Sequence, residues 1–229
     1  MNIRLSAVEA RVIGSLVEKE ITTPDQYPLS LNALVNACNQ KSNRDPVLEL
    51  DERMVQEVLD GLSKRHLVLE RSGFGSRVMK YRHRLCNGDH NPLQFTPQEL
   101  AVVCELLLRG PRTPGELRSG AQRLASFADL GQIEATLKTL VQREDGPFVA
   151  RLERQPGTRE ARYVQLFVEP SAELALSGKD EEPDLPLSPG SSSVAGGAGG
   201  LLARVAALEA EVVALRAELA ELRERLATP

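Results

Sequence analysis

The chain has 229 residues, of which 41% are apolar and 26% charged, a composition that can fill the core of one or two soluble domains. No stretch approaches the roughly 18 consecutive apolar residues of a membrane span, and the first residues do not follow a signal-peptide pattern, so we expect a cytoplasmic protein that does not bind membranes. The net charge of −4 comes from residues 171–229, which carry 5 Lys and Arg against 10 Asp and Glu, whereas residues 1–90 carry 13 against 12. An anionic partner would therefore need a local basic patch.

Four short segments have the residues of a capping box, in which a Ser or Thr hydroxyl accepts from the third helical N–H and a Glu or Gln side chain accepts from the N-cap N–H. The segments are Ser6-Ala7-Val8-Glu9, Thr23-Pro24-Asp25-Gln26, Thr96-Pro97-Gln98-Glu99 and Thr113-Pro114-Gly115-Glu116. In three of them a proline occupies the first helical position, where no N–H donor is needed. Each segment predicts the start of a helix.

The elements that follow these starts repeat in the two halves of the chain. In the first half, apolar spacing predicts a helix after Ser6, a short helix over 31–38 and a third from about Val55 to Leu62, before the two extended runs of HLVLERSGFGSRVMKYRHRL. The second half repeats this order and ends in the extended runs of FVARLERQPGTREARYVQLF. Helix, helix, helix, strand, turn, strand is the order of a winged helix, here present twice at a spacing of about 90 residues.

Several long stretches also resemble the YceH-type family of bacterial proteins. The resemblance covers about residues 3–168 and rests on EARVIGSLVEKEITTPDQYPLSLNALVNACNQKSNR, SGFGSRVMKY, LLLRGPRTPGELRSGA and REDGPFVARL. It implies tandem winged-helix folds and supplies no established activity, so function has to be argued from sites.

The composition changes after residue 168. Residues 169–200 are rich in Pro, Gly, Ser and acidic residues, which predicts a disordered linker. We therefore predict an α+β protein, mostly helical with small β-hairpin wings, in four parts. These are a first winged-helix domain over 1–90, a second over 91–168, the linker over 169–200 and a coiled-coil helix over 201–227.

The last segment places apolar residues at alternating steps of four and three, the seam of a coiled coil. The seam consists of Leu201, Val205, Leu208, Val212, Leu215, Leu219, Leu222 and Leu226. In a parallel pair the flanking charges attract, as Arg204 with Glu209, Glu211 with Arg216 and Glu218 with Arg223. We predict a homodimer through this seam; a lone amphipathic helix packed on its own domain, a trimer and an antiparallel pair are the alternatives.

The two surfaces with which a winged helix contacts nucleic acid differ in charge. The third helix of the first half, DERMVQEVLDGLSKRH, turns Glu52, Glu57 and Asp60 to solvent, and carboxylates there would repel phosphate. The first wing has five cations and no acid, namely Arg71, Arg77, Lys80, Arg82 and Arg84. This wing can contact phosphates, or its cations can simply discourage strand-to-strand aggregation at a solvated edge.

The stretch ACNQKSNRDPV, between the second and third helices of the first half, is unusually polar. Asn39, Asn43 and Asp45 have short side chains that bond nearby backbone and tolerate left-handed conformations, which predicts a well-fixed loop. Closure of such a loop does not require Lys41 or Arg44, so both residues are candidates for a binding surface near the wing. A purely structural turn is the alternative.

Catalytic motifs are not evident, because the chain has no glycine-rich phosphate loop, no nucleophile elbow and no paired carboxylates with a histidine partner. Cys38, Cys86 and Cys104 are odd in number and far apart, and Cys86 with His90 lacks a second ligand pair, so we expect buried thiols without a disulfide, metal or cofactor. We predict a non-enzymatic, nucleic-acid-binding regulator, with DNA as a possible partner; a protein-interaction scaffold is the alternative, and no small-molecule substrate is evident.

Overall fold

The computed structural model describes residues 3–72, 78–89, 91–154 and 160–168. Contacts divide the chain into the units Met1–Asp180 and Glu181–Pro229, and all described residues belong to the first unit. The predicted linker over 169–200, the predicted coil over 201–227 with its seam residues, and Arg77 lie outside the described residues.

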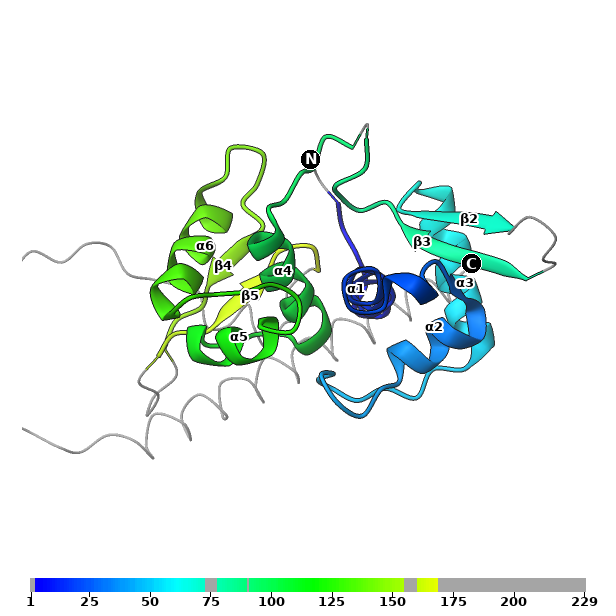
Figure 1. Cartoon of the computed structure of the whole chain (residues 1–229), viewed down its shortest axis with the longest axis horizontal. Coiled ribbons are helices and arrows are strands. Elements are labelled where there is room, and N and C mark those ends of the chain that lie inside the picture. Colours follow the sequence, from blue (N-terminus) through cyan, green and yellow to red (C-terminus); the bar gives the residue numbers. More distant parts are fainter. Residues whose placement is uncertain (1–2, 73–77, 90, 155–159, 169–229) are drawn as a thin grey trace, which may run out of the picture. The chain divides into compact units, whose positions relative to one another are not determined.

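The described part is a mixed α+β structure with helices grouped around small antiparallel sheets (Figure 1). In the first half the elements are α1 (Ala7–Thr22), the 3-10 turn η1 (Pro24–Gln26), β1 (Leu29–Ser30), α2 (Leu31–Cys38), α3 (Glu52–Lys64), β2 (Val68–Ser72) and β3 (Met79–His83). In the second half they are α4 (Pro97–Arg109), α5 (Pro114–Ala121), α6 (Leu130–Gln142), β4 (Val149–Arg151) and β5 (Tyr163–Gln165). The α+β class is confirmed, and each half has three helices followed by a strand pair as predicted; η1 and β1, between the first two helices of the first half, were not predicted.

Helix starts follow the predicted cap chemistry in three of four places. Complete capping boxes join Ser6 with Glu9, Thr96 with Glu99 and Thr113 with Glu116. The prediction for Thr23 is wrong, because its hydroxyl donates to the carbonyl of Lys19 at 3.2 Å and only the three-residue turn η1 follows. The Thr23 hydroxyl thus bonds the last turn of α1 instead of capping a new helix.

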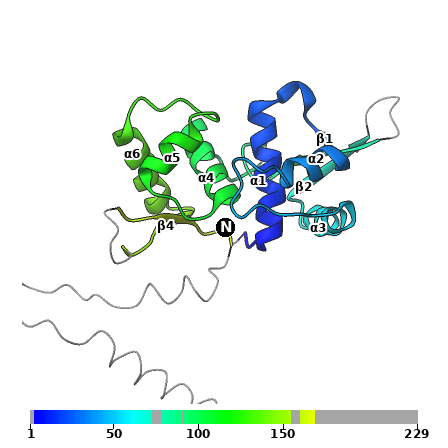
Figure 2. The same cartoon turned by 90° about the horizontal axis from the view of Figure 1, so that it is seen from below.

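The sheet of the first half has the strand order β1-β3-β2, and β4 pairs with β5 in the second half. α3 packs against one face of the β2–β3 pair (Figures 1 and 2). Within the described ranges, none of the helices is both long and apolar enough to cross a membrane.

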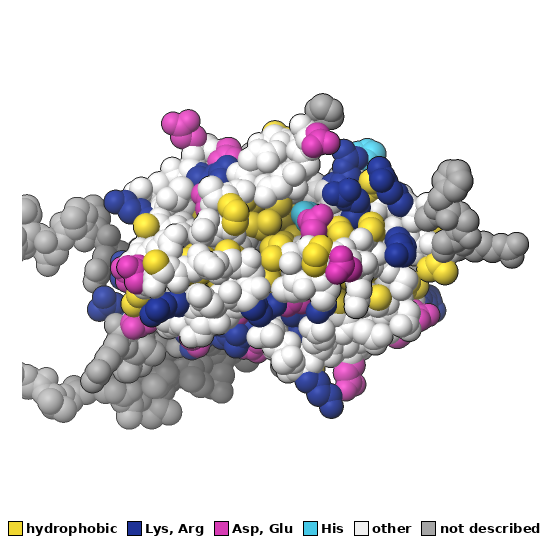
Figure 3. All heavy atoms as spheres, viewed as in Figure 1, with side chains coloured by type: hydrophobic (Ala, Val, Ile, Leu, Met, Phe, Trp, Pro, Cys, Tyr) yellow, Lys and Arg dark blue, Asp and Glu magenta, His cyan; other side chains and the backbone are white. Residues whose placement is uncertain are grey.

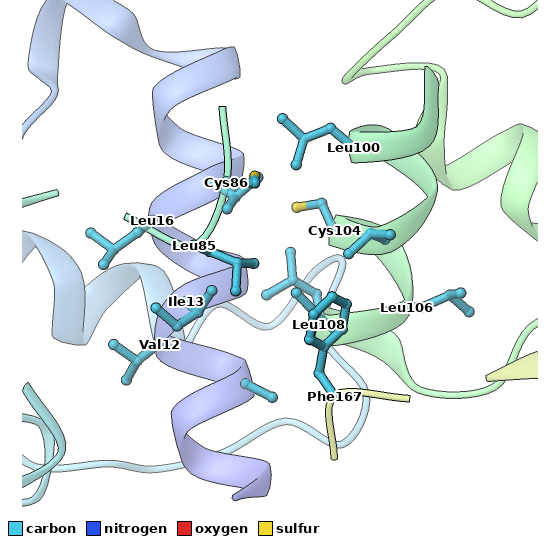
Figure 4. Close-up of a cluster of buried hydrophobic side chains, with 14 of the residues drawn as sticks. Val12, Ile13, Leu16, Leu85, Cys86, Leu100, Cys104, Leu106, Leu108 and Phe167 are labelled. Atoms are coloured by element: carbon cyan, nitrogen blue, oxygen red, sulfur yellow. The ribbon is translucent and has the colours of Figure 1, made fainter. Parts of the chain in front are cut away.

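The two halves meet along α1 and α4 and share one hydrophobic core. In Figure 4, Leu85, Cys86 and Cys104 lie between these helices, while Leu106 points away into the second half. The helices approach closely at Gly14, where an added Cβ would come within 2.9 Å of the Leu108 side chain. The predicted boundary between residues 90 and 91 therefore falls within a continuous core; division into two domains there stays a prediction.

Candidate functional site

Three described basic residues of the first hairpin, Arg71, Lys80 and Arg82, lie on the sheet face that is turned away from α3, and Arg84 follows the end of β3. Along β3, Tyr81 is buried and its hydroxyl donates to Gln56 Oε1 of α3 at 3.1 Å. Side chains alternate along a strand, so Lys80 and Arg82 point to the opposite, outer face. Register places Arg71 of β2 directly across from Lys80, and directly opposed residues share a face. Arg71, Lys80, Arg82 and Arg84 form what we call the basic strip.

Most cations of the basic strip have no carboxylate partner. No acidic group of the described residues lies within 4.0 Å of the charged atoms of Arg71, Lys80 or Arg84. Arg82 has a distant carboxylate partner, because its Nη2 lies 3.6 Å from Glu20 Oε1 of α1. The Arg82 side chain is 41% exposed. On the face that Figure 3 shows, Lys and Arg side chains gather over the base of this hairpin. The strip is thus a positive surface, exposed at Arg71 and Arg84 and partly exposed at Lys80 and Arg82, whose charges are largely unpaired among the described residues.

Arg44 has a different environment, and the prediction that it adds to a binding surface is wrong. Its side chain is fully buried; Nη1 donates to Glu18 Oε1 at 3.0 Å and Nη2 to Glu18 Oε2 at 2.5 Å. Its Nε donates to the carbonyl of Ala37 at 3.0 Å. A phosphate could reach this guanidinium only by breaking a bidentate ion pair inside the protein. Lys41 is exposed, as the prediction for that residue requires.

Arg44 belongs to a group of four residues, Glu18, Arg44, Glu105 and Arg123, which we call the buried charge cluster. Arg123 bonds both acids: it contacts Glu18 Oε1, and its Nη2 lies 3.1 Å from Glu105 Oε2. Both carboxylates are nearly inaccessible to solvent, with 2% exposure for Glu18 and 0% for Glu105. The cluster joins α1, the loop after α2, α4 and the turn after α5.

Burial opposes the ionisation of Glu18, but the hydrogen bond and charge of Arg44, followed by the charge of Arg123, outweigh burial and lower the pKa of Glu18. The same two acids raise the pKa of Arg123 against the opposing effect of its own burial. Glu18 and Arg123 are therefore both charged at neutral pH. The sequence held one signal for it, since Glu105 interrupts the apolar run AVVCELLL and a carboxylate in such a run needs a cation.

The remaining polar residues of the loop between α2 and α3 hold the loop in place. Asn39 exchanges two hydrogen bonds with the backbone of Leu50, at 2.7 and 2.9 Å. Asn43 has the left-handed backbone conformation that its type tolerates, with φ of 55°. Asp45 reaches the second half: its N–H donates to the Leu108 carbonyl at 3.1 Å, and its Oδ2 accepts from Arg112 at 2.7 Å. These contacts support a structural role for the loop.

Comparisons with known proteins identify the family of this chain. A family model described as "Protein of unknown function, DUF480" matches residues 5–158. The chain belongs to this family. Both the basic strip and the buried charge cluster lie within the DUF480 match, whereas residues 201–227 lie outside it.

Relatives in the DUF480 family carry the name UPF0502 protein, and some are called YceH, which confirms the resemblance found in the sequence. The UPF0502 protein of Aeromonas salmonicida is 59% identical over 167 residues, covering 73% of this chain and 76% of the relative. The UPF0502 protein YceH of Salmonella paratyphi A is 55% identical over 176 residues, covering 77% and 82%. That of Escherichia fergusonii is 57% identical over 167 residues, covering 73% and 78%. These names assign no activity, so function is argued from the strip and its surroundings.

The thiols of this DUF480 chain are all buried and free. Burial raises the pKa of Cys86 to about 12 and also raises those of Cys38 and Cys104. A thiol in this state is a poor nucleophile at neutral pH. Among the described residues, His, Cys, Asp and Glu form no group of three or more that could hold a metal ion.

Proposed function

We propose that the chain is a nucleic-acid-binding protein built from two winged helices, and that its basic strip contacts the phosphate backbone. Support for the winged helices comes from the order of elements, three helices followed by an antiparallel strand pair, which occurs in both halves. In this fold the hairpin is one of the two surfaces that contact nucleic acid.

The observation that carries the proposal is the row of unpaired cations on one sheet face. The structure pairs most other arginines of its first half: Arg53 with Glu57 at 3.0 Å, and Arg65 with Glu9 at 2.9 Å. Arg71, Lys80 and Arg84 are left without such partners in the described residues. Cations held close together on a fixed strand repel one another, and phosphate contacts would relieve that repulsion while releasing counterions.

The charge of α3 restricts how nucleic acid is read. Its exposed side includes Glu52, Glu57 and Asp60, and these carboxylates disfavour insertion of the helix into a groove lined by phosphates. Without a recognition helix, contacts along the strip are made mainly to the backbone, which carries no sequence information. We therefore expect binding of duplex DNA that depends weakly on sequence and strongly on salt.

The test is fluorescence anisotropy of a random 30-base-pair duplex with full-length protein at several salt concentrations. The variant Arg71→Ala/Lys80→Ala/Arg84→Ala should bind more weakly, and its log–log salt slope should fall by about 2 to 3, since each lost phosphate contact removes roughly 0.9. The matched control, Arg4→Ala/Lys64→Ala/Arg118→Ala, removes the same charge from exposed positions off the strip. Equal losses in both variants, or no binding by wild type at low salt, would refute the proposal.

The predicted homodimer is part of the same proposal, since two copies would present two basic strips to one duplex. Its support is the heptad seam of residues 201–227 with its attractive flanking charges. Light scattering of the full chain, at a concentration well above micromolar, should give the mass of two chains. A monomeric mass under these conditions contradicts the dimer and leaves the strip proposal standing.

A second candidate function, a protein-interaction scaffold, is favoured by one feature of the surface. A groove of about 390 Å³ between α1 and α3 is lined by Val8, Met54 and Val58, and Met54 is 44% exposed. Exposed apolar side chains in a groove are typical of protein contacts. A bacterial partner retained by wild type and released by Met54→Asp, with duplex binding absent, would favour this function.

A further inference from the structure

A cavity of about 340 Å³ lies where the basic strip ends. Its walls come from the end of α1, from both strands of the β2–β3 pair and from the loop that follows β3. Arg82 and Arg84 of the strip line it together with Glu20 and His83, and Leu69 and Cys86 add apolar surface. The volume falls in the range of small-molecule sites, roughly 300 to 1,000 Å³.

Hydrogen bonds hold two asparagines of the loop wall, Asn87 and Asn91, in place. The Asn87 side chain exchanges two hydrogen bonds with the backbone of Phe95, at 3.0 and 2.7 Å. Asn91 Nδ2 donates to the carbonyl of Arg84 at 2.7 Å, which fixes the backbone that carries this arginine. A ligand that contacts Asn87, Asn91 or the backbone of Arg84 therefore meets groups already held by hydrogen bonds, which limits the entropy lost on binding.

The charges around the cavity leave its guanidinium groups available to an anion. Glu20 Oε2 lies 2.5 Å from His83 Nε2, and its other oxygen is 3.6 Å from Arg82, so this carboxylate is already engaged. Arg84 has no partner for its side chain among the described residues. Asp89, on the loop wall, is the second acid at the cavity and can accept hydrogen bonds from a ligand.

The cavity thus offers cations, an apolar wall at Leu69 and a hydrogen-bond acceptor at Asp89. An inorganic anion would contact the cations but neither Leu69 nor Asp89. We propose that the cavity binds a nucleoside monophosphate, free or as the phosphorylated end of a strand, with the phosphate on Arg84 and Arg82 and the nucleoside against Leu69 and Asp89. Arginine suits this role because its planar fork can donate two hydrogen bonds to one phosphate. In its strand-end form the inference rests on the proposed function; in its free form it does not.

The test is isothermal titration of full-length protein with adenosine 5′-monophosphate, adenosine and inorganic phosphate. We expect the monophosphate to bind more tightly than either of the other two, which each supply half of the contacts. Arg84→Ala should weaken it roughly tenfold or more, through loss of hydrogen bonds to a charged group. The affinity of Arg84→Lys should lie between those of wild type and Arg84→Ala, because lysine keeps the positive charge but cannot donate two hydrogen bonds from a planar guanidinium. Arg71→Ala, which removes a strip cation not among the residues lining the cavity, is the matched control and should bind as wild type.

A second titration separates the two sources of the ligand. If a 5′-phosphorylated single-stranded DNA binds more tightly than the same strand with a 5′-hydroxyl, the ligand is a strand end. If the two strands bind equally and the monophosphate still binds, the ligand is the free nucleotide. The inference is overturned if the monophosphate does not bind, if adenosine binds equally well, or if Arg84→Ala binds it like wild type. Failure of duplex binding with intact monophosphate binding would refute the proposed function alone.

Discussion

The buried charge cluster and the basic strip place arginines of the same half in opposite electrostatic environments. Arg44 is fully buried and bonded to Glu18, a residue 26 positions earlier in the chain. Arg84 is exposed, and the described residues offer its side chain no partner. The first arrangement stabilises the joined halves, whereas the second is left free to bind. The environment of each arginine in this half thus depends on whether the fold brings a carboxylate to it. Four experiments test this difference between the two regions.

Removing Arg44 should lower the stability of the protein more than any of the other changes. In Arg44→Ala, Glu18 loses its bidentate partner inside the protein, and breaking a buried pair in this way typically lowers the free energy of unfolding by about 3–5 kcal/mol. Urea unfolding followed by circular dichroism measures the change. The matched control is Arg53→Ala, whose partner pair with Glu57 is exposed, and it should change stability by less than about 0.5 kcal/mol. Similar values for the two variants would abolish the contrast.

Gly120 in α5 gives a second test of how tightly the cluster is held. A Cβ at this position would lie 2.1 Å from Glu105 Oε1, and that carboxylate is fixed by Arg123 and Arg109. Gly120→Ala should therefore destabilise by about 1–3 kcal/mol through overpacking. Gly61→Ala in α3 meets no atom within 4 Å and should stabilise by up to about 1 kcal/mol, because alanine favours a helix. Thermal unfolding of both variants checks the opposite signs.

The contribution of the Glu18 charge to stability should depend on pH. Its folded pKa is lowered, so its ionisation contributes stability that is present above the unfolded value, about 4.3, and is lost as pH falls through the folded pKa. Glu18→Gln should be less stable than wild type at pH 7, and this difference should shrink below about pH 4 as wild type itself loses the contribution. Unfolding free energies at a series of pH values test this. A difference that is constant with pH would show that Glu18 acts by shape alone.

Removing cations from the basic strip should have the smallest effect on stability. Lys80→Ala and Arg84→Ala break no ion pair among the described residues, so each should change the free energy of unfolding by less than about 0.5 kcal/mol. Urea unfolding of these variants, measured beside Arg44→Ala, gives the two ends of the comparison. A loss above 1 kcal/mol in either variant would mean that the strip has a structural role.

Local chemistry determined the elements of this protein. Apolar spacing and cap residues act within a few positions, which is why the helices after Ser6, Thr96 and Thr113 begin where the sequence predicts. The exception, Thr23, failed for an equally local reason, since its hydroxyl had a second acceptor one turn back in α1. The basic character of the hairpin was also readable, because charge is a property of the residues themselves.

Tertiary structure decided which charges are free. Glu18 and Arg123 are 105 residues apart in the chain, and only the packing of α1 against α4 brings their side chains together. Likewise the register that sets Arg71 across from Lys80 depends on how the two strands pair. The energy of a charge depends on the distance to its partners and on burial, and both are properties of the folded chain. The secondary-structure elements and the charge of each segment thus follow from the residues, whereas the folded chain pairs Arg44 with Glu18 and leaves Arg84 unpaired among the described residues.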